Sequence, residues 1–240
     1  MVTQLPLALR WPRRQRFEHF HAGESAVAVA AVQRAATEAD APWVFLAGPA
    51  ASGKTHLLAA ACQEASDGGR RVQYLPLDAL RGPAASAIRG SGGCALLALD
   101  AVDAICGELE AEHALFDLYN RSRAEGMTLL FAARQPPAQL ALALPDLRSR
   151  LGACTLAKLH PLGEAQRRHV LRTRARARGI ELDDAVMDWL FLHHARDLGT
   201  LGALLDDIDR ASLAAKRRVT LPFLRELLKR DEPDQADGPG

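Results

Sequence analysis

Residues 48–55 have the types and spacing needed to bind phosphate. They read Gly48, Pro49, Ala50, Ala51, Ser52, Gly53, Lys54 and Thr55, which fits the pattern GxxxxGK[ST]. The glycines let the backbone curl so that its N–H groups converge on phosphate oxygens. Lys54 would reach the β- and γ-phosphates, and the Thr55 hydroxyl would bind Mg²⁺. The alternative, a glycine-rich turn that binds nothing, is disfavoured because an apolar strand pattern precedes the loop and a helical pattern follows it.

A second acidic position completes the predicted nucleotide site. Asp100 ends the apolar run ALLALD, where a P-loop ATPase places the carboxylate that holds Mg²⁺. The next position commonly carries an acid that polarises water, but here it is Ala101. Asp103 lies three residues beyond Asp100, and we expect it to cap the following helical segment. The sequence therefore favours holding a nucleotide over hydrolysing it.

The elements that must position these residues alternate between two patterns. Continuous apolar runs typical of buried parallel strands occur at 43–48, 72–77, 94–100, 128–133 and 154–159. Helical spacing occurs at 25–39, where Ser25 is expected to be the cap, at 55–65, at 108–123 and near Gln139. Strands that alternate with helices predict an α/β fold with a five-stranded parallel sheet covered on both faces.

The pattern changes near residue 160, where strand signals stop. Helical spacing continues at 163–178, 183–195, 197–216 and 222–229. We therefore expect a flexible arm at 1–23, an α/β core at 24–160, a small all-helical domain at 161–230 and a disordered acidic tail at 231–240.

Composition excludes several classes of protein. The chain has 240 residues, 48% of them hydrophobic, and 30 Lys+Arg against 29 Asp+Glu give a net charge of +1. This excludes wholesale disorder and argues against bulk electrostatic coating of nucleic acid. The apolar runs are too short to span a bilayer, so we expect a cytoplasmic protein without a membrane partner. Neither a disulfide framework nor a zinc site fits the widely spaced cysteines, which are Cys62, Cys94, Cys106 and Cys154.

Two further segments have competing interpretations. The basic run at 167–179 is expected to form the solvated face of a helix rather than a DNA-binding surface. Phe17 and Phe20 precede the first helix, where they could flank an adenine base or simply anchor the segment.

Longer strings resemble a known family. Besides the loop and ALLALD, the chain contains FDLYNR at 116–121, LPDLRSRL at 144–151, DIDRAS at 207–212 and VTLPFLRELL at 219–228. Their order resembles the AAA+ module of the replication initiator DnaA, and especially the Hda family of DnaA-homologous regulators. The resemblance covers nearly the whole chain and implies an AAA+ core followed by a helical lid, with ADP or ATP as ligand and Mg²⁺ as a possible companion.

The resemblance also assigns roles to individual residues. Arg150 matches an arginine finger that acts in trans on the ATP held by DnaA, with Arg148 as a neighbouring competitor. The N-terminal stretch resembles the peptide by which Hda-type proteins bind the sliding clamp, the β subunit of the replicative polymerase. The anchors in that stretch would be Gln4, Leu5, Leu7 and Leu9. The alternative is that this apolar end packs on its own domain.

The chain departs from the family at sensing positions. The first sensor position holds Ala133 and Arg134 instead of a polar or acidic residue. The second sensor position, usually arginine, aligns with Gly199, and Arg196 lies about one turn earlier. Together with Ala101, these departures imply weak or absent intrinsic ATPase activity, with bound nucleotide, ADP above all, setting the angle between core and lid.

The implied function is negative regulation of replication initiation. The protein would bind DnaA and the DNA-loaded clamp, reach DNA only through the clamp, and promote hydrolysis of DnaA-bound ATP so that re-initiation is prevented. Self-association stays open. The alternatives are an AAA+ replication adaptor or helicase-loader-like module that does not stimulate hydrolysis, and an independent P-loop ATPase. We also expect no room for the C-terminal DNA reader of DnaA.

Overall fold

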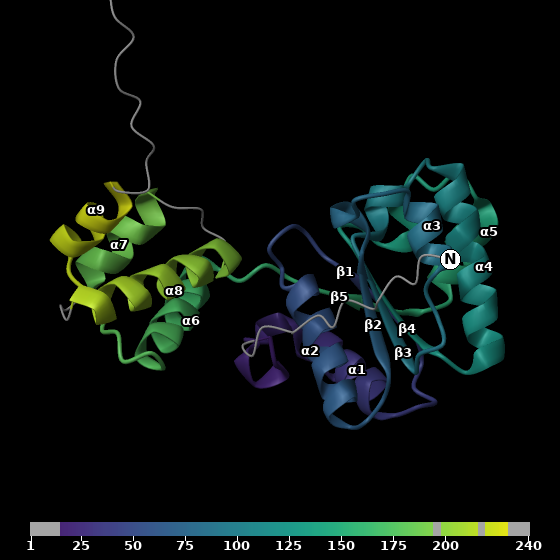
Figure 1. Ribbon diagram of the computed structural model, residues 1–240, viewed down its shortest axis with the longest axis horizontal. Helices are drawn as coiled ribbons and strands as arrows, with labels where there is room; N and C mark the ends of the chain where they lie inside the picture. Colours follow the sequence, from purple (N-terminus) through teal and green to yellow (C-terminus); the bar gives the residue numbers. More distant parts are fainter. Residues whose placement is uncertain (1–14, 194–197, 216–218, 230–240) are drawn as a thin grey trace, which may run out of the picture. The chain divides into compact units, whose positions relative to one another are not determined.

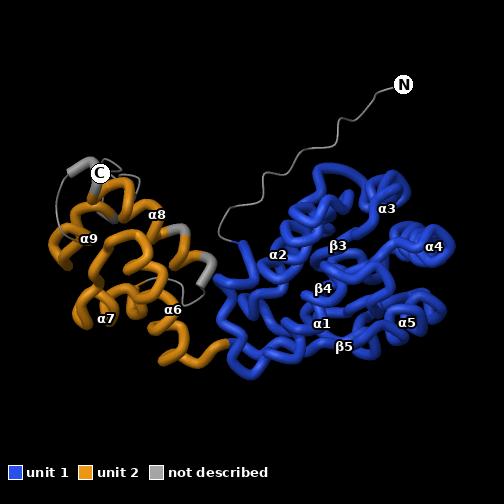
Figure 2. The backbone as a smooth tube through the Cα atoms, turned by 90° about the horizontal axis from the view of Figure 1, so that it is seen from below, with its two compact units in different colours: residues 1–161 blue, residues 162–240 orange. Residues whose placement is uncertain are grey.

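The computed structural model describes residues 15–193, 198–215 and 219–229. Its contacts divide the chain into two compact units, residues 1–161 and residues 162–240, which are coloured separately in Figure 2. The predicted arm and tail lie largely outside the described residues.

The first unit is built on a parallel sheet. Its strands are β1 (Val44–Ala47), β2 (Val72–Pro76), β3 (Leu96–Asp100), β4 (Thr128–Ala133) and β5 (Thr155–Lys158). They lie in the order β2-β3-β4-β1-β5, and every neighbouring pair is parallel. The predicted five-stranded sheet is confirmed, since each expected apolar run contains one strand.

Side chains alternate between two apolar clusters, one on each face of the sheet. Phe45, Leu97 and Phe131 point into the cluster beneath α3 (Ala84–Arg89), α4 (Leu109–Glu125) and α5 (Pro145–Gly152). Their strand neighbours point into the other cluster, beneath α1 (Ala26–Thr37) and α2 (Lys54–Asp67). Figure 1 shows the two helical layers on either side of the sheet. Burial on both faces explains why the strands read as continuous apolar runs.

Three local expectations need correction. The helix near Gln139 is a single 3-10 turn, η5 (Pro137–Gln139), and α3 was not predicted because six residues carry too little periodicity. Ser25 does precede α1, but its side chain makes no capping bond. Its buried hydroxyl instead accepts the N–H of His160, 3.1 Å away, and so ties the start of α1 to the chain after β5.

The second unit is all-helical, as predicted. It contains α6 (Glu164–Arg176), α7 (Asp184–His193), α8 (Leu198–Ala215) and α9 (Leu221–Lys229), which pack around a cluster that includes Leu171, Met187 and Ile208. Asp183 caps α7, since its Oδ1 accepts the N–H of Val186 at 2.7 Å.

Three arginines of the basic run at 167–179 pair with acids. Arg168 pairs with Asp188, Arg172 with Asp184, and Arg178 with Asp206 at 2.7 Å. Across the described ranges, no helix is long and apolar enough to cross a membrane.

Candidate nucleotide-binding site

The phosphate-binding pattern lies between the carboxyl end of β1 and the first turn of α2. The Gly48 N–H donates to the Ala133 carbonyl at 3.2 Å, so the loop begins against the end of β4. Ala51 (φ 59°) and Gly53 (φ 94°) have left-handed backbone conformations. A non-glycine residue in that region costs about 1–3 kcal/mol, and such strain gathers at functional sites. The amino end of α2 opens directly from the loop and carries the partial positive charge that favours phosphate.

The Lys54 side chain folds back over the loop. Its Nζ donates to the carbonyl oxygens of Gly48 and Pro49, at 2.7 Å each. Burial lowers the pKa of the Lys54 ammonium, while the nearby carboxylates of Asp100 and Asp103 act in the opposite direction. The cation is therefore held where the phosphate chain would enter.

The hydroxyl of Ser52 is buried and has no hydrogen-bond partner in the described part of the protein. Its Oγ faces Gly48, because a Cβ built on that glycine would lie only 2.8 Å from it. An orphaned buried hydroxyl is unfavourable by about 1–3 kcal/mol unless a ligand completes it. A buried hydroxyl without a partner fits a loop that closes around phosphate oxygens.

Asp100 is the last residue of β3, which is separated from β1 by β4, and it organises the floor of the site. Its Oδ2 accepts the Thr55 hydroxyl at 2.6 Å and the Tyr74 hydroxyl at 2.8 Å, and its Oδ1 accepts the Ala101 N–H at 2.9 Å. Burial and the adjacent Asp100 carboxylate raise the pKa of Tyr74, so its hydroxyl stays a donor. The carboxylate is only 6% exposed and is fixed in orientation by these three donors.

Thr55 and Asp100 fit a magnesium ion. Because the Thr55 hydroxyl donates its hydrogen to Asp100, its lone pairs remain available for a cation. In the described residues, no cluster of three or more His, Cys, Asp or Glu side chains forms a metal cage. Mg²⁺ commonly takes one or two protein oxygens and completes its shell with phosphate and water, so the oxygens of Thr55 and Asp100 fit it. A bound Mg²⁺ would neutralise charge on the phosphates.

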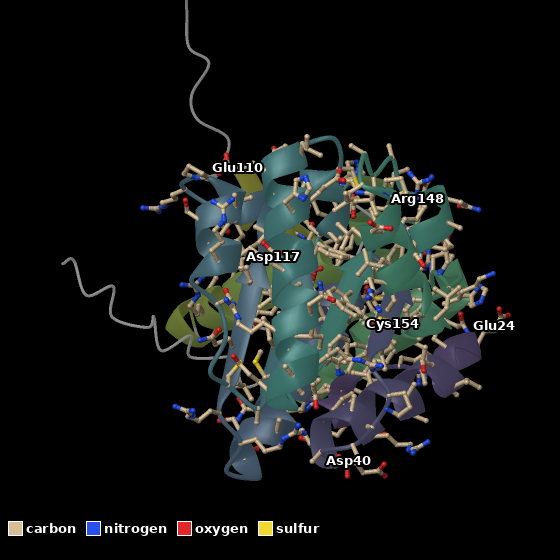
Figure 3. The ribbon with its side chains drawn as sticks, turned by 90° about the vertical axis from the view of Figure 1, so that its right-hand side faces the viewer. Glu24, Asp40, Glu110, Asp117, Arg148 and Cys154 are labelled. Atoms are coloured by element: carbon tan, nitrogen blue, oxygen red, sulfur yellow. The ribbon has the colours of Figure 1, made fainter. Side chains whose placement is uncertain are left out.

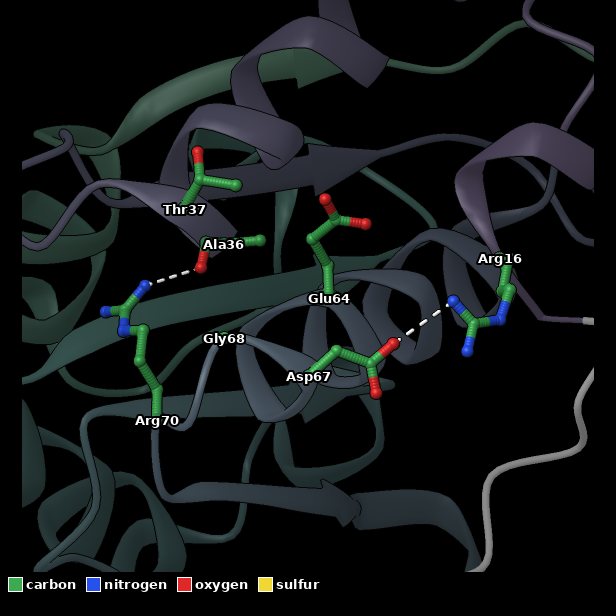
Figure 4. A pocket seen from close by; sticks show the side chains of 7 residues that line it. All are labelled: Arg16, Ala36, Thr37, Glu64, Asp67, Gly68 and Arg70. Atoms are coloured by element: carbon green, nitrogen blue, oxygen red, sulfur yellow. Dashed lines mark hydrogen bonds and ion pairs between the residues drawn. The ribbon is translucent and has the colours of Figure 1, made fainter.

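A hollow of about 400 Å³ lies at the other end of α2 and is a different feature (Figure 4). Arg16 and Asp67 form an ion pair of 3.1 Å across it. The Arg70 guanidinium donates to the Ala36 carbonyl at 2.7 Å and to Ala35, Ala95 and Thr128. These contacts close the carboxyl end of α1 and connect it to β3 and β4, which is a structural role.

The structure distinguishes the two arginines of α5. Arg148 is half-buried, and its Nη2 donates to the Leu142 carbonyl at 2.5 Å. Arg150 is exposed, and its guanidinium carbon lies 6.0 Å from the ring centroid of Tyr119. Tyr119 in turn packs edge-on against Trp43, with ring centroids 4.7 Å apart. Arg150 is therefore the arginine that faces solvent.

Arg150 and the phosphate loop lie at opposite ends of the sheet. Trp43 precedes the first residue of β1, whereas Gly48 follows the last one. Five residue steps along a strand span about 16 Å. Because Arg150 stacks on the aromatic pair at the amino end, it lies far from the loop of its own chain.

Two protein-family models match this chain. The family model for the bacterial DnaA ATPase domain matches residues 12–157, and that for the lid domain of Hda matches residues 164–228. The chain is an Hda-like, DnaA-homologous AAA+ protein. Its α/β core and helical lid are thus the two parts that this family combines.

Solved structures show the same fold as this Hda-like chain. Domain III of Thermotoga maritima DnaA is 21% identical, with a TM-score of 0.70 over 92% of this chain and 98% of that one. AMPPCP-bound DnaA from Aquifex aeolicus is 22% identical, with a TM-score of 0.68 over 92% and 71% of the two chains. The Thermotoga maritima RuvB branch-migration motor is 16% identical, with a TM-score of 0.61 over 89% and 70%.

The position after Asp100 in this Hda-like core has no acid to offer water. Ala101 has a left-handed conformation, with φ 56°. The expectation that Asp103 caps a helix is wrong. Its Oδ1 accepts the Arg134 N–H at 3.0 Å, and its Oδ2 lies 3.4 Å from the Arg134 Nε. Asp103 thus fixes the residue that departs from the family at the first sensor position.

The aromatic segment before α1 is an anchor on the phosphate loop. Phe17 and Phe20 both pack against the α1–α2 side of the core. The Phe20 ring contacts His56 edge-on at 5.4 Å and fills the space beside Gly53, where an added Cβ would come within 2.5 Å of it. The Arg16 carbonyl lies 2.9 Å from the His56 Nε2. These contacts show that the segment is anchored on the core, and the alternative, in which the two rings flank an adenine base, stays a prediction.

Several predicted positions lie elsewhere or outside the described residues. Gln4, Leu5, Leu7 and Leu9 precede residue 15, and Arg196 falls in the gap before α8. Gly199 belongs to the first turn of α8. Sequence reasoning missed Tyr74, because a tyrosine in an apolar strand reads as core until its hydroxyl is placed beside Asp100.

Proposed function

We propose that this chain is a regulator of replication initiation that holds an adenine nucleotide and supplies Arg150 to ATP bound by DnaA. The observation that carries the proposal is the placement of Arg150, exposed on α5 and about 16 Å of strand away from its own phosphate loop. An arginine at that end of the core does not reach the loop of its own chain, so the nucleotide that it is proposed to serve is held by another molecule. Neutralising charge on a transferred phosphoryl group in this way raises hydrolysis rates by about 10³–10⁵.

The nucleotide site is proposed to hold rather than turn over its ligand. Residues 48–55, with Asp100, would bind ADP or ATP, and Thr55 and Asp100 would hold Mg²⁺. Related DnaA structures carry AMPPCP, an ATP analogue, which supports an adenine nucleotide here. Ala101 offers no general base, and both Asp103 oxygens are committed to Arg134. Weak or absent intrinsic ATPase activity follows, and we propose ADP as the resident ligand that sets the core–lid angle.

Recruitment is proposed to use the N-terminal peptide. Gln4 would anchor through its amide, and Leu5, Leu7 and Leu9 would fill an apolar pocket of the sliding clamp. Pro6 favours the extended form and lowers the ordering cost of binding. A protein recruited by a DNA-loaded clamp would act only after replication has begun, so it would prevent re-initiation.

A reconstituted reaction tests this proposal. ATP-loaded DnaA, clamp-loaded DNA and this protein are mixed, and conversion of DnaA-bound ATP to ADP is followed. We expect stimulation that disappears with Arg150→Ala and with the double change Gln4→Ala and Leu5→Ala. Arg89→Ala is the matched control, because Arg89 is an exposed arginine of the same core that pairs with a surface carboxylate, that of Glu110. Stimulation that survives Arg150→Ala would refute the finger, and clamp binding without stimulation would identify the chain as a replication adaptor instead.

A further inference from the structure

A carboxylate outside the nucleotide site is completely buried between α4 and the chain that leads into α5. Glu112 is 0% exposed, although it belongs to the first turn of α4. Its Oε1 accepts the N–H groups of Gly107 and Ala143 at 2.7 and 3.0 Å, and its Oε2 accepts the Leu144 N–H at 2.7 Å. Burying a charge so fully is unfavourable unless its hydrogen bonds are made, and here three amides make them.

Two of these three amides define the start of α5. Leu144 immediately precedes the helix, and Pro145 is its first residue. Proline has no N–H and is favoured at that position, so the carboxylate binds the last two amides that the approaching chain can offer. A negative charge at a helix amino end is also favourable because of the helix dipole. Glu112 therefore holds the chain that enters α5 from a neighbouring helix.

Arg148 reinforces the same junction from within α5. Its guanidinium donates to the Leu142 carbonyl at 2.5 Å and acts electrostatically on Glu112. Burial alone would raise the pKa of the Glu112 carboxyl, but the three amide hydrogen bonds and Arg148 hold it below the ordinary value. The group is thus an anion in the folded core.

The other end of α5 rests on the same face of α4. Tyr119 lies seven residues, or two helical turns, after Glu112, and it is the ring over which Arg150 lies. Figure 3 shows α5 alongside α4, with Glu110 and Arg148 toward one end of the pair and Cys154 further along. Helix α4 therefore binds the chain at the beginning of α5 through the Glu112 carboxylate, and its Tyr119 ring contacts the Arg150 guanidinium near the end of α5.

We propose that Glu112 is a positioning residue that sets the orientation of α5 and thereby of Arg150. The inference rests on the proposed function of Arg150 and adds the residue through which that arginine is aligned. The same carboxylate also binds the N–H of Gly107, which lies in the segment that follows Asp100 and Ala101. Glu112 therefore links α5 to the chain that follows β3, the strand that forms the floor of the nucleotide site.

The test uses the full-length protein with Glu112→Gln, which keeps the size of the side chain but turns one amide acceptor into a donor. Glu110→Gln is the matched control, because Glu110 lies on the same helix and its side chain is 75% exposed. Active protein is counted by ADP-binding stoichiometry, so that a loss of folded molecules does not count as a loss of positioning. Hydrogen exchange of the Ala143 and Leu144 amides is measured in parallel.

We expect Glu112→Gln to lower the maximal stimulated rate of DnaA-bound ATP hydrolysis by about 10- to 100-fold per active molecule, since misplacement by about 1 Å has effects of that size. The protein concentration that gives half-maximal stimulation should stay unchanged. Exchange of the two amides should accelerate at least tenfold, and Glu110→Gln should change neither quantity.

Full stimulation by Glu112→Gln, with Arg150→Ala inactive in the same assay, would overturn the positioning role and leave the proposed function intact. A wild-type protein that does not stimulate would refute the proposed function, while the exchange of the two amides would still report whether Glu112 holds α5. If Glu112→Gln does not fold, Glu112→Asp replaces it, since it keeps the charge but withdraws the carboxylate by one methylene. Rapid exchange of the exposed Ala143 amide in the wild-type protein would also contradict the proposal.

Discussion

The contact between Phe20 and Gly53 predicts a measurable energetic coupling between the N-terminal segment and the phosphate loop. Gly53 has φ +94°, and an added Cβ would lie 2.5 Å from Phe20 Cε2, about 1 Å inside ordinary contact. The left-handed backbone should contribute about 1.5 kcal/mol to the cost of Gly53→Ala, and the overlap a similar amount, giving a destabilisation of about 3 kcal/mol. Phe20→Ala removes a half-buried ring at a cost of about 2 kcal/mol.

The double variant should be less destabilised than the sum of the two. Without the Phe20 ring the overlap vanishes but the backbone strain remains, so we expect about 3.5 kcal/mol instead of an additive 5 kcal/mol. Gly69→Ala is the matched control, because Gly69 follows the other end of α2 with φ +78° and has nothing within 4 Å of its added Cβ. That substitution should show the backbone cost alone and no coupling to Phe20.

The assay is urea denaturation followed by the fluorescence of Trp43, which lies in the core. Trp11 and Trp189 are replaced by Phe in every variant, because Trp189 belongs to the lid and would mix a second signal into the transition. Additivity of Gly53→Ala and Phe20→Ala within about 0.5 kcal/mol would refute the packing of the aromatic segment on the loop.

Three further outcomes are expected. Lys54→Ala should weaken ADP binding by about 10- to 100-fold, measured by calorimetry, because it removes a charge-assisted contact from the loop. Arg70→Ala should lower the unfolding free energy of the core by about 2–4 kcal/mol, whereas the exposed neighbour Arg71→Ala should change it by less than about 0.5 kcal/mol. The folded Glu112 carboxyl has a pKa below its ordinary 4.5, so its stabilisation is present above that pH and lost as pH falls through the folded value. The stability difference between wild type and Glu112→Gln should therefore shrink in denaturation curves recorded below pH 4.5.

The sheet and the phosphate loop could be predicted because their signals are local. The central strands β1, β3 and β4 are continuous apolar runs buried on both faces, the edge strands β2 and β5 lie within shorter runs of the same kind, and the loop motif needs only eight consecutive residues. The lid helices were found from periodicity, and α6–α9 begin within a residue or two of the expected positions. The family resemblance then supplied Arg150, which no local pattern separates from Arg148.

The errors concern polar side chains whose partners are distant in sequence. Ser25 and Asp103 both read as helix caps, yet Ser25 binds the amide of His160 and Asp103 binds that of Arg134. No prediction was made for Glu112, because the amides that bind its carboxylate come from the chain before α4 and from a loop about thirty residues later. Such contacts arise only once the sheet has brought these segments together.

Three arginines of the basic run at 167–179 have a consequence for how the lid meets polyanions. Arg168, Arg172 and Arg178 already pair with carboxylates of α7 and α8. Tight binding to DNA gains much of its free energy when mobile cations are released from the duplex by incoming, unpaired cationic groups. An arginine that must first give up a covalently tethered carboxylate gains little from that entropy. These three arginines should therefore add little to any affinity for a duplex or to its dependence on ionic strength.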